Sequence, residues 1–314
     1  MPKQEETLTG IHFLLTYQCT NECDHCFLHC GPQAEGTFTI SQVQQVLKEI
    51  AKTKSIDNVY FEGGEPFLFY PLMVESIRQA RKQGLDVGIV SNAYWAKSPE
   101  DAELWLKPLA KLGISDLSLS DDLFHQESLD NSPAKIGRAT AKKLGIPADT
   151  ICIGPAKVEN SPDSTGHKGE PVVGGGVKFR GRAVEKLTAD LPRRSWKQFT
   201  SCPHEELEHP GRVHIDSYGN VHLCQGLLMG NMWQTPLSTL IKNYDVNSHP
   251  ICGPLIKGGP AQLAQQYEVA LEEGYIDECH LCYLTRQSLI DRFPQYLSPK
   301  QVYGLEDTPT HPIP

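Results

Sequence analysis

The chain has 314 residues, of which 39% are hydrophobic, and its formal net charge at pH 7 is −9. This length suits one large domain and a smaller one. The lack of an apolar run of about 18 residues argues against a membrane-spanning helix, and the acidic balance argues against a nucleic-acid-binding protein. Ten cysteines and no secretory signal in residues 1–9 favour a cytoplasmic location and metal ligation over disulfides.

The first predicted strand, residues 11–15, leads into three cysteines with C-x3-C-x2-C spacing: Cys19, Cys23 and Cys26. A four-iron cluster is normally held by four thiolates, so three on one loop would leave one iron open to another ligand. A structural zinc ion is the alternative, although zinc usually needs a second cysteine or histidine pair to complete its tetrahedron. The spacing by itself leaves both metals open.

A glycine motif follows the second predicted strand. Thr39 can cap a helix with one apolar face that extends to residue 50. Residues 59–61 then form a β-branched and aromatic strand, which runs into Gly63-Gly64-Glu65-Pro66. Glycines allow the backbone to approach a ligand closely because they have no Cβ. Taken alone, the motif could be an ordinary turn.

Together, the cysteine loop and the glycine motif resemble the radical S-adenosylmethionine (SAM) superfamily. The resemblance implies that Cys19, Cys23 and Cys26 hold a [4Fe-4S] cluster whose open iron is chelated by SAM. It implies that the SAM amino group contacts the motif Gly63, Gly64, Glu65 and Pro66. It also implies the reaction type, in which SAM is cleaved reductively to a 5′-deoxyadenosyl radical that abstracts a hydrogen atom from the substrate.

Strand and helix patterns continue to alternate along the chain. Helices are predicted at 72–83, 99–112 and 133–144, and strands at 87–90, 117–119, 151–153 and 177–179. Such alternation predicts an α/β fold with a parallel sheet. The resemblance implies that residues 1–190 form a partial (β/α)6 barrel, whose ligand-binding groups collect beyond the carboxyl ends of the strands.

Two further strand ends resemble positions that contact SAM. Ser91 and Asn92 follow the third strand, and Ser120 follows the fourth. The resemblance implies that these side chains face SAM, and that Asp122 and His125 point into the barrel mouth as substrate-binding or proton-handling groups. Helix capping or a surface position is the alternative for each of them.

Two segments after the predicted barrel strands have unusual compositions. Residues 154–176 are rich in glycine, proline and serine and are expected to form a loop that can act as a lid. Basic residues crowd the next stretch, either as a solvated helix face or as a docking surface for an acidic electron donor or an anionic substrate. They are Lys178, Arg180, Arg182, Lys186, Arg193, Arg194 and Lys197.

The second half contains another set of cysteines. Cys202 and Cys224 flank a predicted hairpin of residues 212–215 and 221–223, and Cys279 and Cys282 form a C-x2-C pair. Four thiolates match a fully ligated iron-sulfur cluster or a zinc site, and spacing does not separate the two. The Gly219-x4-Cys224 pattern resembles the SPASM and twitch extensions of radical SAM enzymes. This implies an auxiliary [4Fe-4S] cluster in residues 191–298, followed by an extended tail of residues 299–314.

Three cysteines remain outside these sets. Cys152 lies in an apolar run and is expected in the core. Cys30 is expected to be a neutral neighbour of the first cluster, with a substrate-side thiol as the alternative. Cys252 could replace one of the four auxiliary ligands, so the assignment of that quartet depends on the substitution not occurring.

The resemblance implies an oxidoreductase in which the closed auxiliary cluster accepts the electron left on the substrate radical. The expected partners are a low-potential electron donor such as flavodoxin or ferredoxin and a substrate that is a small molecule or a short peptide. The alternatives are a radical SAM maturase that crosslinks peptides or oxidises protein side chains, and a zinc-binding interaction protein without catalytic activity. A nearby gene for a precursor peptide or tight peptide binding would favour the maturase, whereas a colourless protein that contains zinc would favour the interaction protein.

Overall fold

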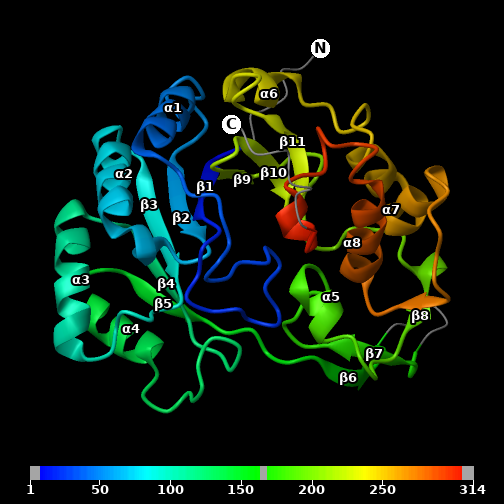
Figure 1. The fold of residues 1–314 in the computed structure, drawn as a ribbon, viewed down its shortest axis with the longest axis horizontal. Helices are drawn as coiled ribbons and strands as arrows, with labels where there is room; N and C mark the ends of the chain where they lie inside the picture. Colours follow the sequence, from blue (N-terminus) through cyan, green and yellow to red (C-terminus); the bar gives the residue numbers. More distant parts are fainter. Residues whose placement is uncertain (1–7, 163–167, 306–314) are drawn as a thin grey trace, which may run out of the picture.

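The computed structural model describes residues 8–162 and 168–305, and its centre is one eight-stranded sheet (Figure 1). The strand order is β11-β10-β9-β1-β2-β3-β4-β5. These strands are β1 (Gly10–Thr16), β2 (Asn58–Gly63), β3 (Asp86–Ser91), β4 (Asp116–Ser120), β5 (Ala148–Ile151), β9 (Arg212–Asp216), β10 (Asn220–Cys224) and β11 (Leu227–Asn231).

Four helices connect the parallel strands β1 to β5 and lie together along one face of them (Figure 1). They are α1 (Ile40–Ile50), α2 (Tyr70–Lys82), α3 (Pro99–Leu112) and α4 (Pro133–Lys143). The predicted helices of this half are therefore confirmed to within about two residues at their ends. Local capping explains this accuracy, because Thr39 forms a capping box with Gln42 at the start of α1 and Ser98 caps α3.

The α/β fold with a partial barrel is confirmed, but the prediction of its sixth strand was wrong. Residues 177–179 form no strand; Val177 and Phe179 are buried in a small cluster of their own. The short alternating pattern Val177-Lys178-Phe179 is equally compatible with a packed loop. The sixth parallel strand is β9, which pairs with β1 in the register Ile11↔Val213. The predicted hairpin of β9 and β10 is confirmed, and β11 extends it.

The sheet has two different faces. Side chains that point toward the helices are apolar and buried, such as Phe13 and Phe61, whose rings stack with centroids 5.0 Å apart. On the opposite face, every second residue of β2 and β4 is half-buried, and these residues include polar side chains. This second face is the inner face of the partial barrel, and the cysteine loop that follows β1 lies at its edge.

The remaining described elements lie beyond the sheet. They are the short strands β6 (Lys157–Asn160), β7 (Pro171–Gly174), β8 (Arg194–Ser195) and β12 (Gly274–Tyr275), the helices α5 (Arg182–Lys186), α6 (Leu237–Asn243), α7 (Cys252–Gln266) and α8 (Glu278–Leu289), and the 3-10 helices η1 (Pro66–Phe69), η2 (Trp196–Gln198) and η3 (Lys300–Tyr303). The α7 helix is kinked at Gly258 and Gly259. No helix in the described parts of the chain is long and apolar enough to cross a membrane.

Three local predictions were wrong. The segment 154–176 contains the antiparallel hairpin of β6 and β7 rather than a plain loop, and residues 163–167 lie outside the described residues. Cys152 is exposed, like the last three residues of β5 before it, because β5 is an edge strand of the sheet. The predicted tail begins with η3, where Val302 and Tyr303 are buried, while residues 306–314 lie outside the described range. The division at residue 190 stays a prediction, and the sheet continues across it through β9 to β11.

Candidate functional site

The three N-terminal cysteines lie on the loop that follows β1. Cys19 is buried, and the side-chain amide of Asn92 donates to its Sγ over 3.6 Å. Burial raises the pKa of the Cys19 thiol to about 12. Metal binding requires the thiolate, so a bound metal ion would supply the positive charge that this buried position lacks.

Cys26 differs from Cys19 because a neighbouring thiol stabilises its thiolate. A hydrogen bond from Cys30 lowers the pKa of Cys26 to about 6, against the effect of burial. Cys30 itself is buried at 2% exposure. This contact agrees with the expectation that Cys30 is a neutral neighbour of the cysteine loop.

The glycines of the motif after β2 accommodate the cysteine loop itself. A Cβ at Gly64 would lie 2.1 Å from the carbonyl oxygen of Gln18, and one at Gly63 would lie 2.5 Å from that of Thr16. The backbone N–H of Gly64 donates to Thr16 over 2.7 Å, and that of Glu65 donates to Gln18 over 2.9 Å. The sequence analysis expected these glycines to let a ligand approach the backbone closely. In the structure, the backbone of Thr16 and Gln18 occupies that close position. A contact between this motif and SAM stays a prediction.

The Glu65 side chain joins the ends of β2 and β3. Its Oε1 accepts from the Phe67 N–H and the Ser91 hydroxyl at 3.0 and 2.9 Å, and its Oε2 accepts from the Asn92 N–H at 2.7 Å. Burial raises the pKa of this carboxyl to about 7, although the three hydrogen bonds lower it. Pro66 follows as the first residue of η1, which Glu65 caps. Both residues thus hold the floor of the site in place.

We expect Glu65→Gln to lower the free energy of unfolding by about 1–3 kcal/mol. The substitution replaces one carboxylate oxygen by an NH2 group, which cannot accept a hydrogen bond and leaves at least one buried donor without a partner. Chemical denaturation at about pH 8, where the native carboxyl is ionised, measures the effect. Glu127→Gln, at an exposed position, is the matched control. Equal unfolding midpoints for the two variants would show that Glu65 has no anchoring role.

The other predicted SAM-contacting residues have distinct environments. Asn92 bridges the strand end to the cysteine loop, since its amide also donates to the Thr20 hydroxyl over 2.9 Å. The Ser91 hydroxyl accepts from the indole of Trp95 over 3.0 Å while donating to Glu65, so it is engaged inside the protein. Ser120 is half-buried at the end of β4. The structure therefore brings Asn92 to the cysteines and leaves Ser91 in a supporting position.

Asp122 and His125 form a pair beside the cysteine loop. The Oδ1 of Asp122 lies 2.8 Å from Nδ1 of His125, and its Oδ2 accepts from the Ile153 N–H over 3.0 Å. The pKa of His125 is raised to about 10, because hydrogen bonds to Asp122 and Cys23 outweigh the lowering effect of burial. The side chain of Asn21 donates to the His125 carbonyl over 3.3 Å. These contacts place the predicted catalytic pair next to the predicted cluster ligands.

The four C-terminal cysteines line one cavity. Cys224 ends β10, while Cys279 and Cys282 lie on α8 at the i, i+3 spacing that places them on one face. Cys202, on the loop after η2, completes the lining, and Cys252 does not contribute to it. Cys252 is instead fully buried in the main hydrophobic core. The geometry thus groups the predicted quartet.

Two arginines that the sequence analysis gave no role here line the same cavity. The guanidinium of Arg180 donates to the Cys224 sulfur over 3.0 Å. Arg286 donates to the Gln225 carbonyl over 2.9 Å. In both, Nε is buried without a hydrogen-bond partner. Buried cations need compensating negative charge. Glu205 lies 3.2 Å from Arg180 and supplies part of it, whereas Arg286 forms no ion pair within the described residues, and a cluster held by four thiolates is an anion. The residues therefore fit such a group.

The spacing of the sulfurs favours clusters over single zinc ions. Zinc with four sulfur ligands at about 2.3 Å needs sulfurs about 3.8 Å apart. Within residues 8–162 and 168–305, no three cysteine sulfurs lie within 4.8 Å of one another, although a His-Glu-His group meets this limit. Both cysteine sets are therefore more open than a zinc site requires.

The segment of Arg180, Gly181 and Arg182 links the two sets of cysteines, so these arginines are not part of a solvated basic face. Arg182 donates from Nη1 and Nη2 to the carbonyls of Cys23 and Cys30, over 2.7 and 2.8 Å. Gly181 has a φ of 62°, and a Cβ there would lie 2.4 Å from the Cα of Phe27. Arg180 meanwhile contacts Cys224. One tripeptide therefore packs against both candidate cluster sites.

We expect Arg182→Met to increase amide hydrogen exchange across residues 19–30 by at least about tenfold, because it removes two charge-assisted hydrogen bonds to the loop. Hydrogen exchange with mass spectrometry on anaerobically loaded protein measures this. Lys186→Met, an exposed position on the same short helix, is the control. Unchanged exchange in Arg182→Met would mean that the loop is held by its cysteines alone.

Sequence reasoning missed one further polar group on the inner face of the sheet: His12, Glu62 and His214. They come from β1, β2 and β9. The available signal was the presence of polar residues at inward positions of otherwise apolar strands.

Comparisons with known proteins agree with the family resemblance predicted from the cysteine loop. A sequence profile of the radical SAM superfamily matches residues 13–163. YydG of Bacillus subtilis (strain 168), whose name assigns it to peptide biosynthesis, is 20% identical over 259 residues, which cover 82% of this chain and 73% of that protein. A tungsten-containing aldehyde ferredoxin oxidoreductase cofactor-modifying protein of Pyrococcus furiosus is 26% identical over 114 residues, which cover 36% of this chain and 30% of that protein.

Two solved structures are similar in outline. One is BtrN in complex with AdoMet and 2-DOIA, with a TM-score of 0.48 and 13% identity, covering 89% of this chain and 90% of that chain. The other is Streptococcus suis SuiB bound to S-adenosylmethionine, with a TM-score of 0.49 and 14% identity, covering 87% of this chain and 77% of that chain. At TM-scores below 0.5, these similarities carry no functional argument.

Proposed function

Because the chain carries a radical SAM domain, matched over residues 13–163, we propose that it cleaves SAM at a [4Fe-4S] cluster held by Cys19, Cys23 and Cys26. The observation that most directly supports this proposal is the position of these cysteines on the loop after β1, directly against the glycine motif at the end of β2. When bound, the cluster and SAM would supply a 5′-deoxyadenosyl radical that takes a hydrogen atom from the substrate.

The protein's own residues hold this site in shape before any ligand binds. Asn92 and Arg182 fix the cysteine loop from two sides, and Glu65 ties the neighbouring strand ends together. Such preorganisation lowers the cost of positioning a reactive group. Ser120, which is half-buried at the end of β4, and the Asp122–His125 pair are proposed to face SAM and the substrate at the barrel mouth.

We further propose that residues 191–298 form a SPASM- or twitch-like domain whose auxiliary [4Fe-4S] cluster is held by Cys202, Cys224, Cys279 and Cys282. The shared cavity and the unpaired nitrogens of Arg180 and Arg286 support this assignment. Such a cluster would supply an electron acceptor for the substrate radical, which makes the overall reaction an oxidation. A low-potential flavodoxin or ferredoxin is the proposed source of the electron for SAM cleavage.

A peptide substrate is favoured over a small molecule by the similarity to YydG, which extends over 82% of this chain. The proposed activity is then the oxidation or crosslinking of residues in a short peptide. A small-molecule substrate remains the alternative, and a zinc-binding interaction protein is disfavoured by the wide spacing of the cysteine sulfurs.

Anaerobic reconstitution tests this proposal. The loaded protein should be brown, hold about eight irons per chain and release 5′-deoxyadenosine from SAM under a strong reductant. About four irons would remove the auxiliary cluster. Protein with full iron content that never cleaves SAM would refute the proposal, as would a colourless protein that contains zinc. Incubation with precursor peptides encoded near the gene, followed by mass spectrometry, separates a peptide substrate from a small molecule.

A further inference from the structure

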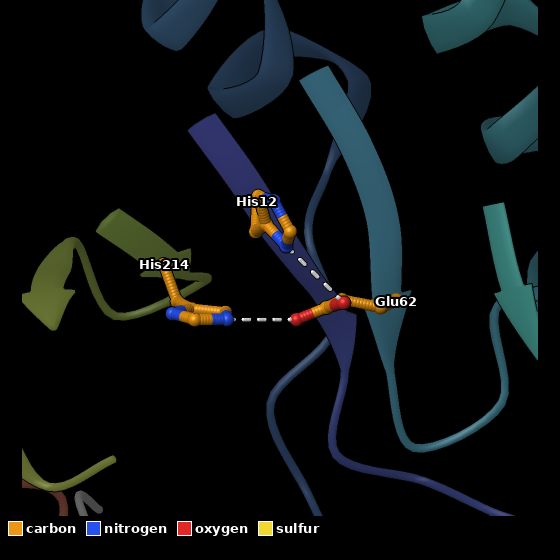
Figure 2. Close-up of side chains that lie close together, drawn as sticks. All are labelled: His12, Glu62 and His214. Atoms are coloured by element: carbon orange, nitrogen blue, oxygen red, sulfur yellow. Dashed lines mark ion pairs between the residues drawn. The ribbon is translucent and has the colours of Figure 1, made fainter. Parts of the chain in front are cut away.

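The inner face of the barrel carries a group of side chains that converge from three adjacent strands. His12 on β1, Glu62 on β2 and His214 on β9 point toward one another (Figure 2). Nδ1 of His12 lies 3.3 Å from Oε2 of Glu62, and Nε2 of His214 lies 3.0 Å from Oε1 of the same carboxylate. One ligand atom from each residue lies within 4.8 Å of the other two.

The sheet positions this group rigidly. His12 and His214 are directly opposite each other in the parallel register of β1 and β9. The ring of Tyr60, from the next strand, stacks on His12 with centroids 4.7 Å apart. The side chains of His12, Glu62 and His214 keep 16%, 19% and 10% of their surface exposed. They are therefore supported from within the sheet and remain accessible from the barrel interior.

Hydrogen bonding within the group is incomplete. His12 Nδ1 is buried and has no hydrogen-bond partner, although Glu62 lies close to it. A neighbouring pair on β9 and β10 provides the contrast: His222 is fully buried, its Nε2 lies 3.1 Å from Asp216, and its Nδ1 accepts from the Gly226 N–H over 3.1 Å. His222 has the complete bonding of a structural histidine, whereas the group around Glu62 has an unused nitrogen aimed at a carboxylate.

The ligand types of this group also suit a transition-metal ion. Two imidazoles and one carboxylate offer the nitrogen and oxygen donors that such ions accept.

We propose that His12, Glu62 and His214 bind a divalent first-row transition metal ion on the inner face of the barrel. Metal–ligand bonds of about 2.1 Å place neighbouring ligand atoms about 3.0–3.4 Å apart. The two histidine nitrogens lie 3.3 and 3.0 Å from different oxygens of Glu62, and one ligand atom from each residue lies within 4.8 Å of the other two, so small side-chain rotations would complete the site. Two histidines and one carboxylate leave coordination positions open. The ion can therefore also bind an oxygen donor from a substrate.

The proposed metal site lies near the candidate SAM site. The evidence for the metal site does not depend on the proposed function. Glu62 directly precedes Gly63, whose neighbour Gly64 donates to the carbonyl of Thr16 at the end of β1, where the cysteine loop begins. A substrate oxygen bound to the metal, such as a peptide carbonyl or carboxylate, would therefore be held on the same face of the sheet as the candidate SAM site. The metal site itself rests only on the three side chains.

The test is a titration of the holoenzyme with Mn²⁺, followed by loss of the free-ion EPR signal. Clusters occupy the cysteines in this form, and Mn²⁺ prefers oxygen and nitrogen ligands. We expect one Mn²⁺ per chain, displaced by lower concentrations of Zn²⁺, as the general order of metal affinities requires. His214→Asn and Glu62→Gln should each weaken binding at least about 100-fold. His209→Asn, an exposed histidine, should bind as the wild type does.

Iron content reports whether each variant has kept its fold. If one ligand variant loses its iron, the other two ligand positions still decide the question, with His12→Asn as the third variant. A wild-type protein that binds neither Mn²⁺ nor Zn²⁺ up to about 1 mM would overturn the proposal. Binding that all folded ligand variants retain would overturn it too. Either result is independent of whether the protein cleaves SAM, so the two proposals fail separately.

Discussion

Cys26→Ala is expected to reduce the release of 5′-deoxyadenosine from SAM by at least about 1,000-fold, to the background of the assay. The thiolate of Cys26 is stabilised by the hydrogen bond from Cys30, which lowers the pKa of Cys26 to about 6. Removing Cys26 leaves only two of the three proposed ligands, which is too few to hold a cluster and keep one iron open for SAM. Iron per chain should fall from about eight to about four.

Two other cysteines serve as controls for this prediction. Cys152→Ala changes an exposed thiol and should leave both iron content and SAM cleavage unchanged. Cys30→Ala removes the hydrogen-bond donor but no ligand, so the cluster should form and cleavage should persist. SAM cleavage at the wild-type rate in Cys26→Ala would exclude this loop as the reaction centre.

The second large effect is expected from the double variant Cys279→Ala/Cys282→Ala. Iron should again fall to about four per chain, but SAM cleavage should stay within about threefold of the wild type, because the N-terminal cluster is intact. Oxidation of the substrate should drop at least about 100-fold, since the acceptor for its electron is gone. Iron analysis, 5′-deoxyadenosine release and substrate turnover measured on one preparation separate these effects.

Cys252→Ala is the matched control for the auxiliary site. Cys252 is fully buried but does not line the cavity that the other four cysteines share. We expect a loss of stability without loss of iron, because a small core side chain is truncated. If Cys252→Ala loses about four irons while Cys202→Ala keeps them, then Cys252 is the ligand and the proposed quartet is wrong.

Local signals allowed much of the fold to be predicted. The α3 helix begins at Pro99 after the capping residue Ser98, and it ends before Gly113, whose φ of 68° suits glycine. Both signals lie within a few residues of the helix ends. The parallel strands of the N-terminal half follow from the alternation of strands and helices. The strand predicted at 177–179 was wrong because two buried apolar residues around Lys178 fit a packed loop as well as a short strand.

Such local signals do not predict which distant strands pair with each other. The hairpin of β9 and β10 was recognisable from its turn, but its addition to the free edge of β1 was not. That pairing depends on which sheet edge remains uncovered after the rest of the chain has folded. The basic stretch shows the same limit, because the composition around Arg180 predicts a solvated face while the structure buries it at 7% exposure beside Cys224.

The sequence by itself predicted a metal site on the N-terminal loop, because Cys19, Cys23 and Cys26 are close along the chain, and the glycine motif at Gly63 favoured an iron-sulfur cluster over zinc. It also determined the helices, through caps a few residues long. Only the tertiary structure decided that the four distant cysteines share a cavity and that His12, Glu62 and His214 meet on one face. The physical reason is that strand neighbours are selected by the packing of the whole sheet, which periodicity within a single strand does not encode.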